Sequence, residues 1–503
     1  MSIILEELTI ADMQRLMAVG DLTAVELTEG YLARIEAIDR AGPALNAIIE
    51  LNPDALAIAT QLDAERAAGD VRGPLHGIPI LLKDNIDTGD RIATSAGSLA
   101  LADHHAAQDS TVAANLRRAG AIILGKTNLS EWANFRSSKS SSGWSSRGGQ
   151  TRNPYALDRT PCGSSSGSGV AVSANLCAAA IGTETDGSIV CPSHHAGIVG
   201  LKPTVGLVSR AGIVPISHSQ DTAGPMTRTV ADAAILLAAL IGVDVLDPAT
   251  AASQAQTRDD YAQFLDRDGL RGARIGVARN FFGFHPLVDT LMERAILTLR
   301  AAGAVVIDPA NIVTAKQFDD DEFTVLLYEF KTDLNAYLAG VEPQLPVHSL
   351  AELIEFNHRH RTQVMPYFGQ ELLVLAEEKG DLFEDDYLQA RKKSLALAGK
   401  EGIDAVMAQH NLDALIAPTG GPAWLVDWVN SDHHGGGSSS PAAVAGYPAI
   451  TVPAGFVHGL PIGLTFMAGA WQEPTLIKLA YAFEQQTHIR RPPTFLRGDQ
   501  IFA

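Results

Sequence analysis

The order of apolar and polar segments along the chain predicts an α/β fold. Helical spacing marks two helices within residues 9–40. Short apolar strands are expected at 78–82 and 121–124, with a helix over 112–119 between them. Because strands and helices keep alternating past residue 200, the pattern favours a large mixed central sheet covered by helices on both faces.

The second half of the chain follows a different order. Residues 315–400 are more charged and have helical spacing, so we expect them to form a helical elaboration near the substrate entrance. Further apolar segments predict three strands and a covering helix, at 415–417, 450–452, 462–466 and 474–486. No internal repeat is visible, and we expect a single domain over 1–503 with its core at 70–230.

Residues 135–169 are rich in Ser, Gly and Arg and have weak periodicity. Disorder is one reading of such a composition, but Trp144 and the apolar segments on either side favour an ordered loop over a site. Its last part, Ser and Gly at 163–169, leads directly into the apolar segment 170–181. Serine hydroxyls and glycine backbone at the edge of a hydrophobic core predict a polar reaction centre rather than a flexible linker.

The net charge of the chain limits the classes of partner that it is expected to bind. The 503 residues include 38 Lys and Arg against 57 Asp and Glu, a net charge of −19 that disfavours nucleic acid and anionic membranes. No apolar run is long enough to span a bilayer, and the N-terminal MSIILEELTI lacks the basic region of a signal peptide. We therefore expect a cytoplasmic enzyme, either a monomer or a homodimer. Its three cysteines, Cys162, Cys177 and Cys191, are interpreted as small buried thiols.

Two short patterns suggest other chemistry. Residues 120–127 satisfy the phosphate-loop pattern, but their middle four residues form an apolar strand rather than a loop. Residues 163–167 satisfy G-x-S-x-G with Ser165 at the centre. Turn residues precede this pattern where a nucleophile elbow needs a strand, although a later histidine could still complete a triad; the candidates are His433, His434, His458 and His488.

The histidine pairs do not suggest a metal site. None has the i, i+4 spacing with an acid that zinc hydrolases use. We interpret His104, His105, His194 and His195 as solvated or loop histidines, and no metal or cofactor is expected.

Three polar features in apolar surroundings fit one mechanism. Lys83 ends the strand 78–82, the Ser/Gly run follows later, and the polar segment 182–189 comes directly after 170–181. A serine needs a base to act as a nucleophile, and a buried lysine can be neutral near pH 7. A second hydroxyl can relay the proton, and backbone N–H groups in a tight turn can hold an oxyanion.

The segments 77–85, 125–132, 162–169 and 182–189 resemble the amidase signature family, as do 221–226 and 459–463. The resemblance implies that Lys83 is the base, Ser164 a relay serine held by a cis peptide, and Ser188 the nucleophile. Ser164 and Ser188 are 24 residues apart, the separation found in the family, which selects Ser164 over Ser165 and Ser166. The resemblance also assigns the oxyanion to backbone N–H groups; these belong to Thr185, Asp186, Gly187 and Ser188.

The chain departs from the family pattern around the nucleophile. The family has Asp-x-Gly-Gly-Ser where this chain has Glu184-Thr-Asp186-Gly-Ser, and Val190 replaces an arginine. An Asp–Arg contact common in the family is therefore absent, which leaves the support of this turn open.

Within the family, many segments are similar to bacterial peptide amidases, for example SEWANFRSS, PCGSSSGS and IGTETDGSIVCP. This similarity implies hydrolysis of the C-terminal amide of peptides to acid and ammonia. Trp132, Tyr328 and Trp424 are expected to shape the substrate pocket. The alternatives are an amidase or esterase acting on aryl amides or carbamates, and an aminoacyl-tRNA amidotransferase subunit.

Overall fold

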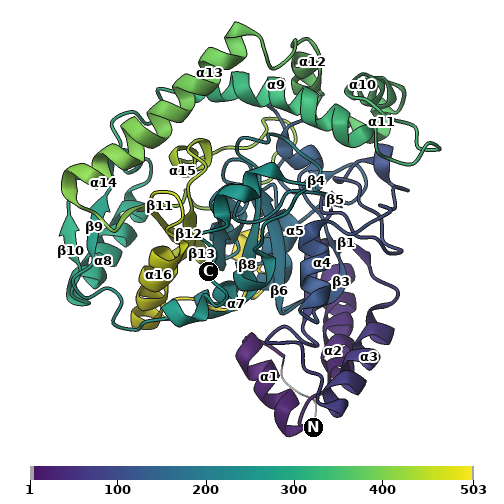
Figure 1. Ribbon diagram of the computed structural model, residues 1–503, viewed down its shortest axis with the longest axis horizontal. Coiled ribbons are helices and arrows are strands. Elements are labelled where there is room, and N and C mark those ends of the chain that lie inside the picture. Colours follow the sequence, from purple (N-terminus) through teal and green to yellow (C-terminus); the bar gives the residue numbers. More distant parts are fainter. Residues whose placement is uncertain (1–4, 501–503) are drawn as a thin grey trace.

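The computed structural model describes residues 5–500, and its centre is an eleven-stranded sheet (Figure 1). In spatial order the strands are β1 (Ile48–Leu51), β3 (Ile122–Thr127), β2 (Pro79–Lys83), β6 (Ala179–Glu184), β8 (Thr222–Thr227), β7 (Val199–Lys202), β12 (Ala449–Val457), β13 (Leu460–Met467), β11 (Ala414–Pro418), β9 (Arg274–Val277) and β10 (Val305–Ile307). Residues 1–4 lie outside the described range. They are the first residues of MSIILEELTI, the N-terminal segment that lacks the basic region of a signal peptide.

The sheet is mixed, as the sequence predicts. β3, β2 and β6 run parallel at one side, and β11, β9 and β10 run parallel at the other. Between them, neighbours from β6 to β11 pair antiparallel, and so do β1 and β3 at the edge. The carboxyl ends of parallel β2 and β6 therefore lie together, which brings Lys83 beside the segment that follows Glu184.

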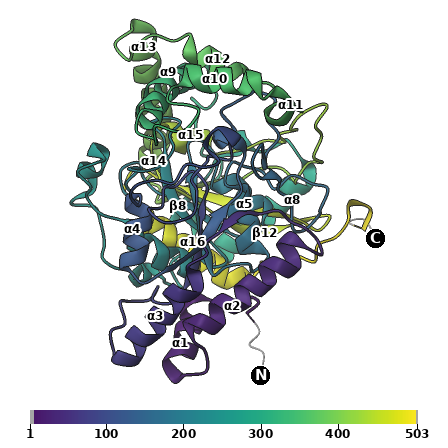
Figure 2. The ribbon, with the colours of Figure 1, turned by 90° about the vertical axis from the view of Figure 1, so that its right-hand side faces the viewer.

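Helices pack against this sheet. Those in contact with it or with its loops are α3 (Ala55–Ala68), α4 (Thr111–Arg118), α5 (Ser166–Ser173), α6 (Val190–His195), α7 (Val230–Leu240), α8 (Pro286–Ala301) and α16 (Glu473–Thr487). α1 (Ile10–Val19) and α2 (Ala24–Arg34) lie with α3 at one end of the molecule (Figures 1 and 2). No helix among the described residues is both long and apolar enough to cross a membrane.

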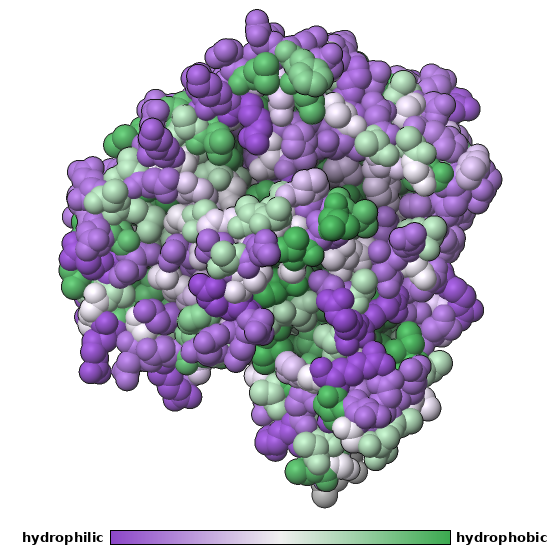
Figure 3. Space-filling model, in the orientation of Figure 1, coloured by the Kyte–Doolittle hydropathy of each residue, from purple (hydrophilic) through white to green (hydrophobic). Residues whose placement is uncertain are grey.

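A separate group of helices arches along the opposite end (green in Figures 1 and 2). Its members are α9 (Asp319–Leu338), α10 (Leu350–Arg359), α11 (Arg361–Val364), α12 (Glu371–Glu377), α13 (Asp385–Leu395) and, further on, α14 (Asp404–His410). The short helix α15 (Ser440–Val444) lies below the arch (yellow in Figure 1). α9 to α12 share an apolar cluster that includes Phe330, Leu334 and Leu353. In Figure 3 the outer surface is mostly hydrophilic, and apolar residues gather across the middle of the molecule below the arch.

The Ser-rich segment 135–169 is ordered. It contains the short strands β4 (Trp144–Ser145) and β5 (Gly149–Gln150), and Trp144 is buried. Ser145 donates from its hydroxyl to Asn128 Oδ1 at 2.7 Å. Because hydroxyls such as that of Ser145 bond to the protein framework, the composition that resembles a disordered segment here forms a packed loop.

Two arginines from distant parts of the chain bind carbonyls at or just after the carboxyl ends of α5 and α6. Arg34 donates to the carbonyl oxygens of Ala174 and Asn175 at 3.0 and 2.8 Å. Arg490 donates to Ser173 O at 3.0 Å and to Gly197 O at 2.9 Å. Cationic side chains at helix carboxyl ends complement the helix dipole and satisfy carbonyls that lack intrahelical partners.

Candidate active site

Lys83 is completely buried at the end of β2. Its Nζ lies 2.7 Å from Ser164 Oγ, 2.8 Å from Thr183 Oγ1 and 3.3 Å from Thr183 O. Burial lowers the pKa of Lys83 to about 7, against the attraction of Asp221 and Glu184. The lysine is therefore held near neutrality with three oxygen atoms around it.

Ser164 stands just before α5, and the peptide bond between Gly163 and Ser164 is cis. The neighbouring serines have other partners: Ser165 donates to Thr183 O at 3.0 Å, Ser166 to Cys162 O at 2.5 Å, and Ser168 to Ile181 O at 3.1 Å. Only Ser164 in this run contacts Lys83. The Ser/Gly run therefore presents one hydroxyl to the lysine and uses the others to bind strands and turns.

Ser188 lies in the turn between β6 and α6. Its carbonyl accepts from Ser165 N at 3.2 Å, which holds the turn against the start of α5. Gly187 has φ +81°, and a side chain there would lie 3.1 Å from Ser439 Oγ, so the turn requires glycine. Within residues 5–500, the N–H groups of Asp186, Gly187 and Ser188 donate to no protein atom, which leaves them available to a ligand.

Glu184 supports the turn that carries Ser188, where the expected Asp–Arg contact is missing. Its Oε2 accepts from Ile189 N at 2.7 Å and from Val190 N at 2.9 Å. These are the N–H groups at the start of α6, where a carboxylate is favoured by the helix dipole. Burial raises the pKa of Glu184, opposed by Lys202 and by these two hydrogen bonds.

A second set of bonds holds the turn from the side of the helical arch. Thr185 donates from Oγ1 to Asp221 Oδ1 at 2.5 Å. Asp221 in turn accepts from the backbone N–H groups of Ile216 and Ser217 at 2.8 and 2.9 Å. Ser217 donates to Glu329 of α9. The turn is thereby connected through one loop to the first long helix of the arch.

Asp186 replaces the glycine usual in the family. Its Oδ2 accepts from Ser440 Oγ at 2.6 Å, whereas Oδ1 is buried without a partner. Burial raises the pKa of Asp186, opposed by Ser439, Ser440 and Lys202. The Asp186 side chain therefore connects the turn that carries Ser188 to the start of α15.

A cavity of about 600 Å³ opens at this turn. Ser188 lines it, whereas Ser164 and Lys83 lie behind the wall and are fully buried. Its apolar lining comes from Phe135, Ile216, Phe281, Phe282, Phe284 and Leu326. A larger cleft of about 1080 Å³ lies between residues 39–49, 150–158 and 426–429, and none of Lys83, Ser164 and Ser188 lines it.

The three aromatic residues expected at the pocket do not line this cavity. Trp132 is buried in the apolar cluster of the arch. Tyr328 donates to Glu384 Oε2 at 2.6 Å on the arch itself. Trp424 packs its ring 4.7 Å from that of His434, which does line the cavity. Trp424 is thus one side chain away from the cavity. Trp132 packs in the same apolar cluster as the cavity-lining Phe135 and Ile216, and Tyr328 lies on α9 of the arch.

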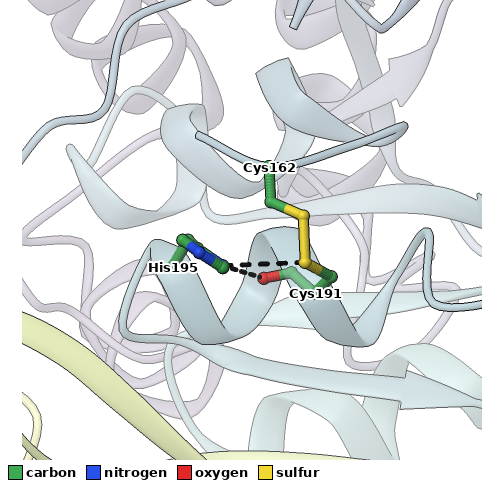
Figure 4. Close-up of side chains that lie close together, drawn as sticks. All are labelled: Cys162, Cys191 and His195. Atoms are coloured by element: carbon green, nitrogen blue, oxygen red, sulfur yellow. Dashed lines mark hydrogen bonds between the residues drawn. A yellow bond between two sulfur atoms is a disulfide. The ribbon is translucent and has the colours of Figure 1, made fainter. Parts of the chain in front are cut away.

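The interpretation of all three cysteines as thiols is wrong for two of them. Cys162 and Cys191 form a disulfide, with Cα atoms 6.0 Å apart, and Cys177 is a free buried thiol (Figure 4). The two cysteines are far apart in the sequence, but they meet in the fold because the turn before α5 packs directly on α6.

The interpretation of the histidines as solvated or loop residues is wrong for His194 and His195, which are buried in α6. His194 accepts at Nδ1 from Gly463 N at 2.7 Å, and its Nε2 lies 2.8 Å from Gly421 O. Burial lowers the pKa of His194 to about 4, so it serves as a neutral connector between α6 and β13.

The phosphate-loop pattern at 120–127 lies in and before β3, as the apolar residues predict. Lys126 is fully buried and donates to Ile86 O, Ala93 O and Thr94 Oγ1 at 2.8, 3.2 and 2.7 Å. A lysine with three protein acceptors in the core is a structural connector rather than a phosphate ligand.

Sequence reasoning missed Thr183 and Gln220. Thr183 binds Lys83 through both of its oxygen atoms, and Gln220 donates to Thr185 O at 3.3 Å. The polar residue at the end of a buried strand was a signal for Thr183. No sequence signal marks Gln220, because its contacts depend on where α9 packs.

The chain is similar to known amidases along almost its whole length. The family model described as Amidase matches residues 26–477. The structure of native peptide amidase from Stenotrophomonas maltophilia superposes with a TM-score of 0.93 at 55% identity, covering 97% of this chain and 99% of that chain. An Arabidopsis thaliana protein named Probable amidase is 43% identical, over 98% of this chain and 92% of its own. The glutamyl-tRNA(Gln) amidotransferase of Symbiobacterium thermophilum has a subunit that is 35% identical, over 96% of this chain and 98% of its own.

Proposed function

The chain belongs to the amidase signature family and is a hydrolase of amide C–N bonds, and we propose that it deamidates the C-terminal amides of peptides through Ser188, Ser164 and Lys83. The substrate would be a peptide amide, and the products a peptide acid and ammonia.

The contacts of Lys83 carry this proposal. A neutral amine has two N–H donors and one lone pair. If Nζ donates to Thr183 O and Thr183 Oγ1, at 3.3 and 2.8 Å, its lone pair faces Ser164 Oγ at 2.7 Å. Lys83 can then accept a proton from Ser164, because burial holds the pKa of its ammonium group near neutrality.

The proposed reaction needs the substrate, one water molecule and proton transfers among the three side chains. Ser164 passes its proton to Lys83 and takes the proton of Ser188, whose Oγ attacks the carboxamide carbon. The N–H groups of residues 185–188 would bind the resulting oxyanion. The proton returns through Ser164 to the amide nitrogen as the C–N bond breaks and ammonia leaves. Water then attacks the Ser188 ester by the same relay, releasing the acid and restoring the serine hydroxyl.

Two observations support a peptide amide as the substrate class. The cavity of about 600 Å³ has the size of small-molecule sites and is lined by several aromatic and aliphatic side chains, which suits the apolar residues of a short peptide. The structure with 55% identity is that of a peptide amidase. For Trp132, Tyr328 and Trp424 we propose an indirect influence on the pocket, with Trp424 acting through His434.

The experiment is an ammonia-release assay on a peptide amide, with mass spectrometry of the peptide product. We expect a mass change of the C-terminal carboxamide only, with internal peptide bonds intact, and loss of activity in Ser188→Ala. Cleavage of internal bonds, or full activity of Ser188→Ala, would contradict the proposal. An anilide and free glutamine, tested in parallel, distinguish the aryl-amidase and amidotransferase alternatives.

A further inference from the structure

The Cys162–Cys191 disulfide forms part of the wall of the catalytic cavity. Cys162 comes two residues before Ser164, and Cys191 comes three residues after Ser188. Cys191 is half-buried, so a small molecule in the cavity can reach the sulfur–sulfur bond. The disulfide thus joins the two segments that carry Ser164 and Ser188, and both of its cysteines line the same cavity as Ser188.

His195 lies beside this disulfide, one turn further along α6 (Figure 4). Its Nδ1 is 3.7 Å from Cys191 Sγ and 3.0 Å from Cys191 O. Its Nε2 is buried and has no hydrogen-bond partner. Burial, together with His194 and His434, lowers the pKa of His195 well below its usual value, so the ring is neutral. A neutral imidazole is the form that binds metal ions.

The three side chains have the composition of a soft-metal site. One ligand atom from each of Cys162, Cys191 and His195 lies within 4.8 Å of the others. Zinc takes sulfur at about 2.3 Å and imidazole nitrogen at about 2.0–2.1 Å, which separates ligands around one ion by roughly 3–4 Å. Small side-chain rotations would therefore bring the three atoms to coordination distance once the sulfurs are separate.

We propose that this pair is a redox-controlled metal site, in which a dithiol reductant opens the disulfide and the two thiols bind a thiophilic divalent cation together with His195. The dithiol supplies two electrons and two protons and becomes a cyclic disulfide, while the cysteines become thiols. Metal binding then releases both thiol protons to solvent. The proton on His195 Nδ1 moves to Nε2, which leaves the Nδ1 lone pair for the metal.

Three protein ligands leave the fourth position of a tetrahedral ion open, and the two cysteines that would hold the ion line the cavity. An ion at this place would fix the turn before Ser164 to α6 and put a bound water where the substrate enters. The reduced enzyme is therefore expected to lose activity when the metal binds. This inhibition rests on the proposed function, whereas the binding itself does not.

The test uses the full-length protein, reduced with a dithiol, freed of reductant and titrated with Cd²⁺. We expect one equivalent to bind with a sulfur-to-metal ultraviolet absorption band, and amide turnover to fall at least tenfold and return on addition of a chelator. The oxidised protein should show neither effect. A disulfide that resists the dithiol in the native protein, unfolding on reduction, or an equal band in the oxidised protein would overturn the proposal.

Matched variants distinguish this site from binding at the buried thiol of Cys177. Cys177→Ala removes the only other thiol and should leave the band unchanged, whereas Cys191→Ser should abolish it. His195→Gln should weaken Cd²⁺ binding at least tenfold while its circular dichroism stays native. Ser188→Ala should keep the band although it has lost hydrolysis, so metal binding is measured even if the proposed reaction is wrong. A band that depends on Cys177 would assign the metal to a different place.

Discussion

Gln220 donates a hydrogen bond from its amide nitrogen to Glu322 Oε1 at 2.9 Å, and the same nitrogen lies 3.3 Å from Thr185 O. The contact joins α9 of the helical arch to the turn that carries Ser188. Because this turn presents the N–H groups proposed to hold the oxyanion, the arch would support the proposed catalytic residues as well as cover them.

Replacing Gln220 with alanine should lower kcat about tenfold or more and change KM little. The variant removes a donor to Thr185 O, so the N–H groups of the turn are less well fixed when negative charge develops on the substrate oxygen. Steady-state kinetics on a peptide amide measure this split. A rise in KM with unchanged kcat would instead mean that Gln220 acts on substrate binding.

Glu322 offers a matched pair of variants for the same contact. Burial, together with the nearby Asp186, raises the pKa of Glu322 well above its usual value. Glu322→Gln keeps the acceptor for Gln220 without a charge and should retain activity within about threefold. Glu322→Leu removes the acceptor and should reproduce the kcat loss of Gln220→Ala. Equal kinetics of the two Glu322 variants would contradict the link.

The activity should depend on pH through Lys83. Because the pKa of Lys83 is about 7, the lysine is protonated below that pH and cannot act as a base. We expect kcat/KM to fall about tenfold for each pH unit below 7 and to level off above it. Lys83→Ala should lose about 10²–10⁴-fold in kcat/KM. A level profile from pH 5 to 9 would be inconsistent with this base.

The same pKa has a consequence for stability. The free lysine has a pKa of 10.5, so between about 7 and 10.5 the unfolded chain binds more protons than the folded protein. The contribution of Lys83 to the free energy of unfolding therefore becomes more favourable as pH rises through this range. Urea denaturation at pH 7 and 9 should show that trend, and Lys83→Met should reduce it.

Ser165→Ala tests the nucleophile-elbow alternative. Ser165 Oγ donates to Thr183 O at 3.0 Å and accepts from Thr183 N at 3.2 Å, so its hydroxyl is already engaged by β6. We expect the variant to lose about 1–3 kcal/mol in the free energy of unfolding, because two buried backbone groups lose a partner. Activity in the folded fraction should stay within a few-fold of the wild type. Complete loss of turnover in a well-folded variant would favour the elbow.

Glu184→Ala should reduce both stability and turnover. The change leaves Ile189 N and Val190 N without an acceptor at the buried start of α6, at a cost of about 1–3 kcal/mol. Thermal unfolding and kcat measure the two effects. Glu184→Gln retains an oxygen for both N–H groups and serves as the control, so it should recover most of the stability. If the two variants are equally destabilised, the charge opposite Lys202 matters more than the hydrogen bonds.

Local patterns predicted the sheet strands and the helical region well, because these depend on apolar periodicity. The strands expected at 78–82, 415–417 and 462–466 correspond to β2, β11 and β13, with boundaries shifted by only a few residues. The expected contact between the strand-end lysine and the first serine of the Ser/Gly run is also present in the structure.

Long-range packing could not be predicted in the same way. The Cys162–Cys191 bond depends on how the turn before α5 meets α6, and no local spacing reports that contact. The same holds for Gln220, whose role comes from a helix that begins about a hundred residues later. Apolar periodicity shows which side of an element is buried, but it does not show which other element covers it.

The bonds of Arg34 and Arg490 have a consequence for protein synthesis. These arginines bind the far ends of α5 and α6, whose other ends lie next to Ser164 and Ser188. Residue 490 leaves the ribosome long after both serines, so a nascent chain contains the reactive residues well before it can complete their framework. The proposed catalytic centre therefore acquires this support only at the end of translation, and shortened chains that stop before residue 490 would carry Lys83, Ser164 and Ser188 without it.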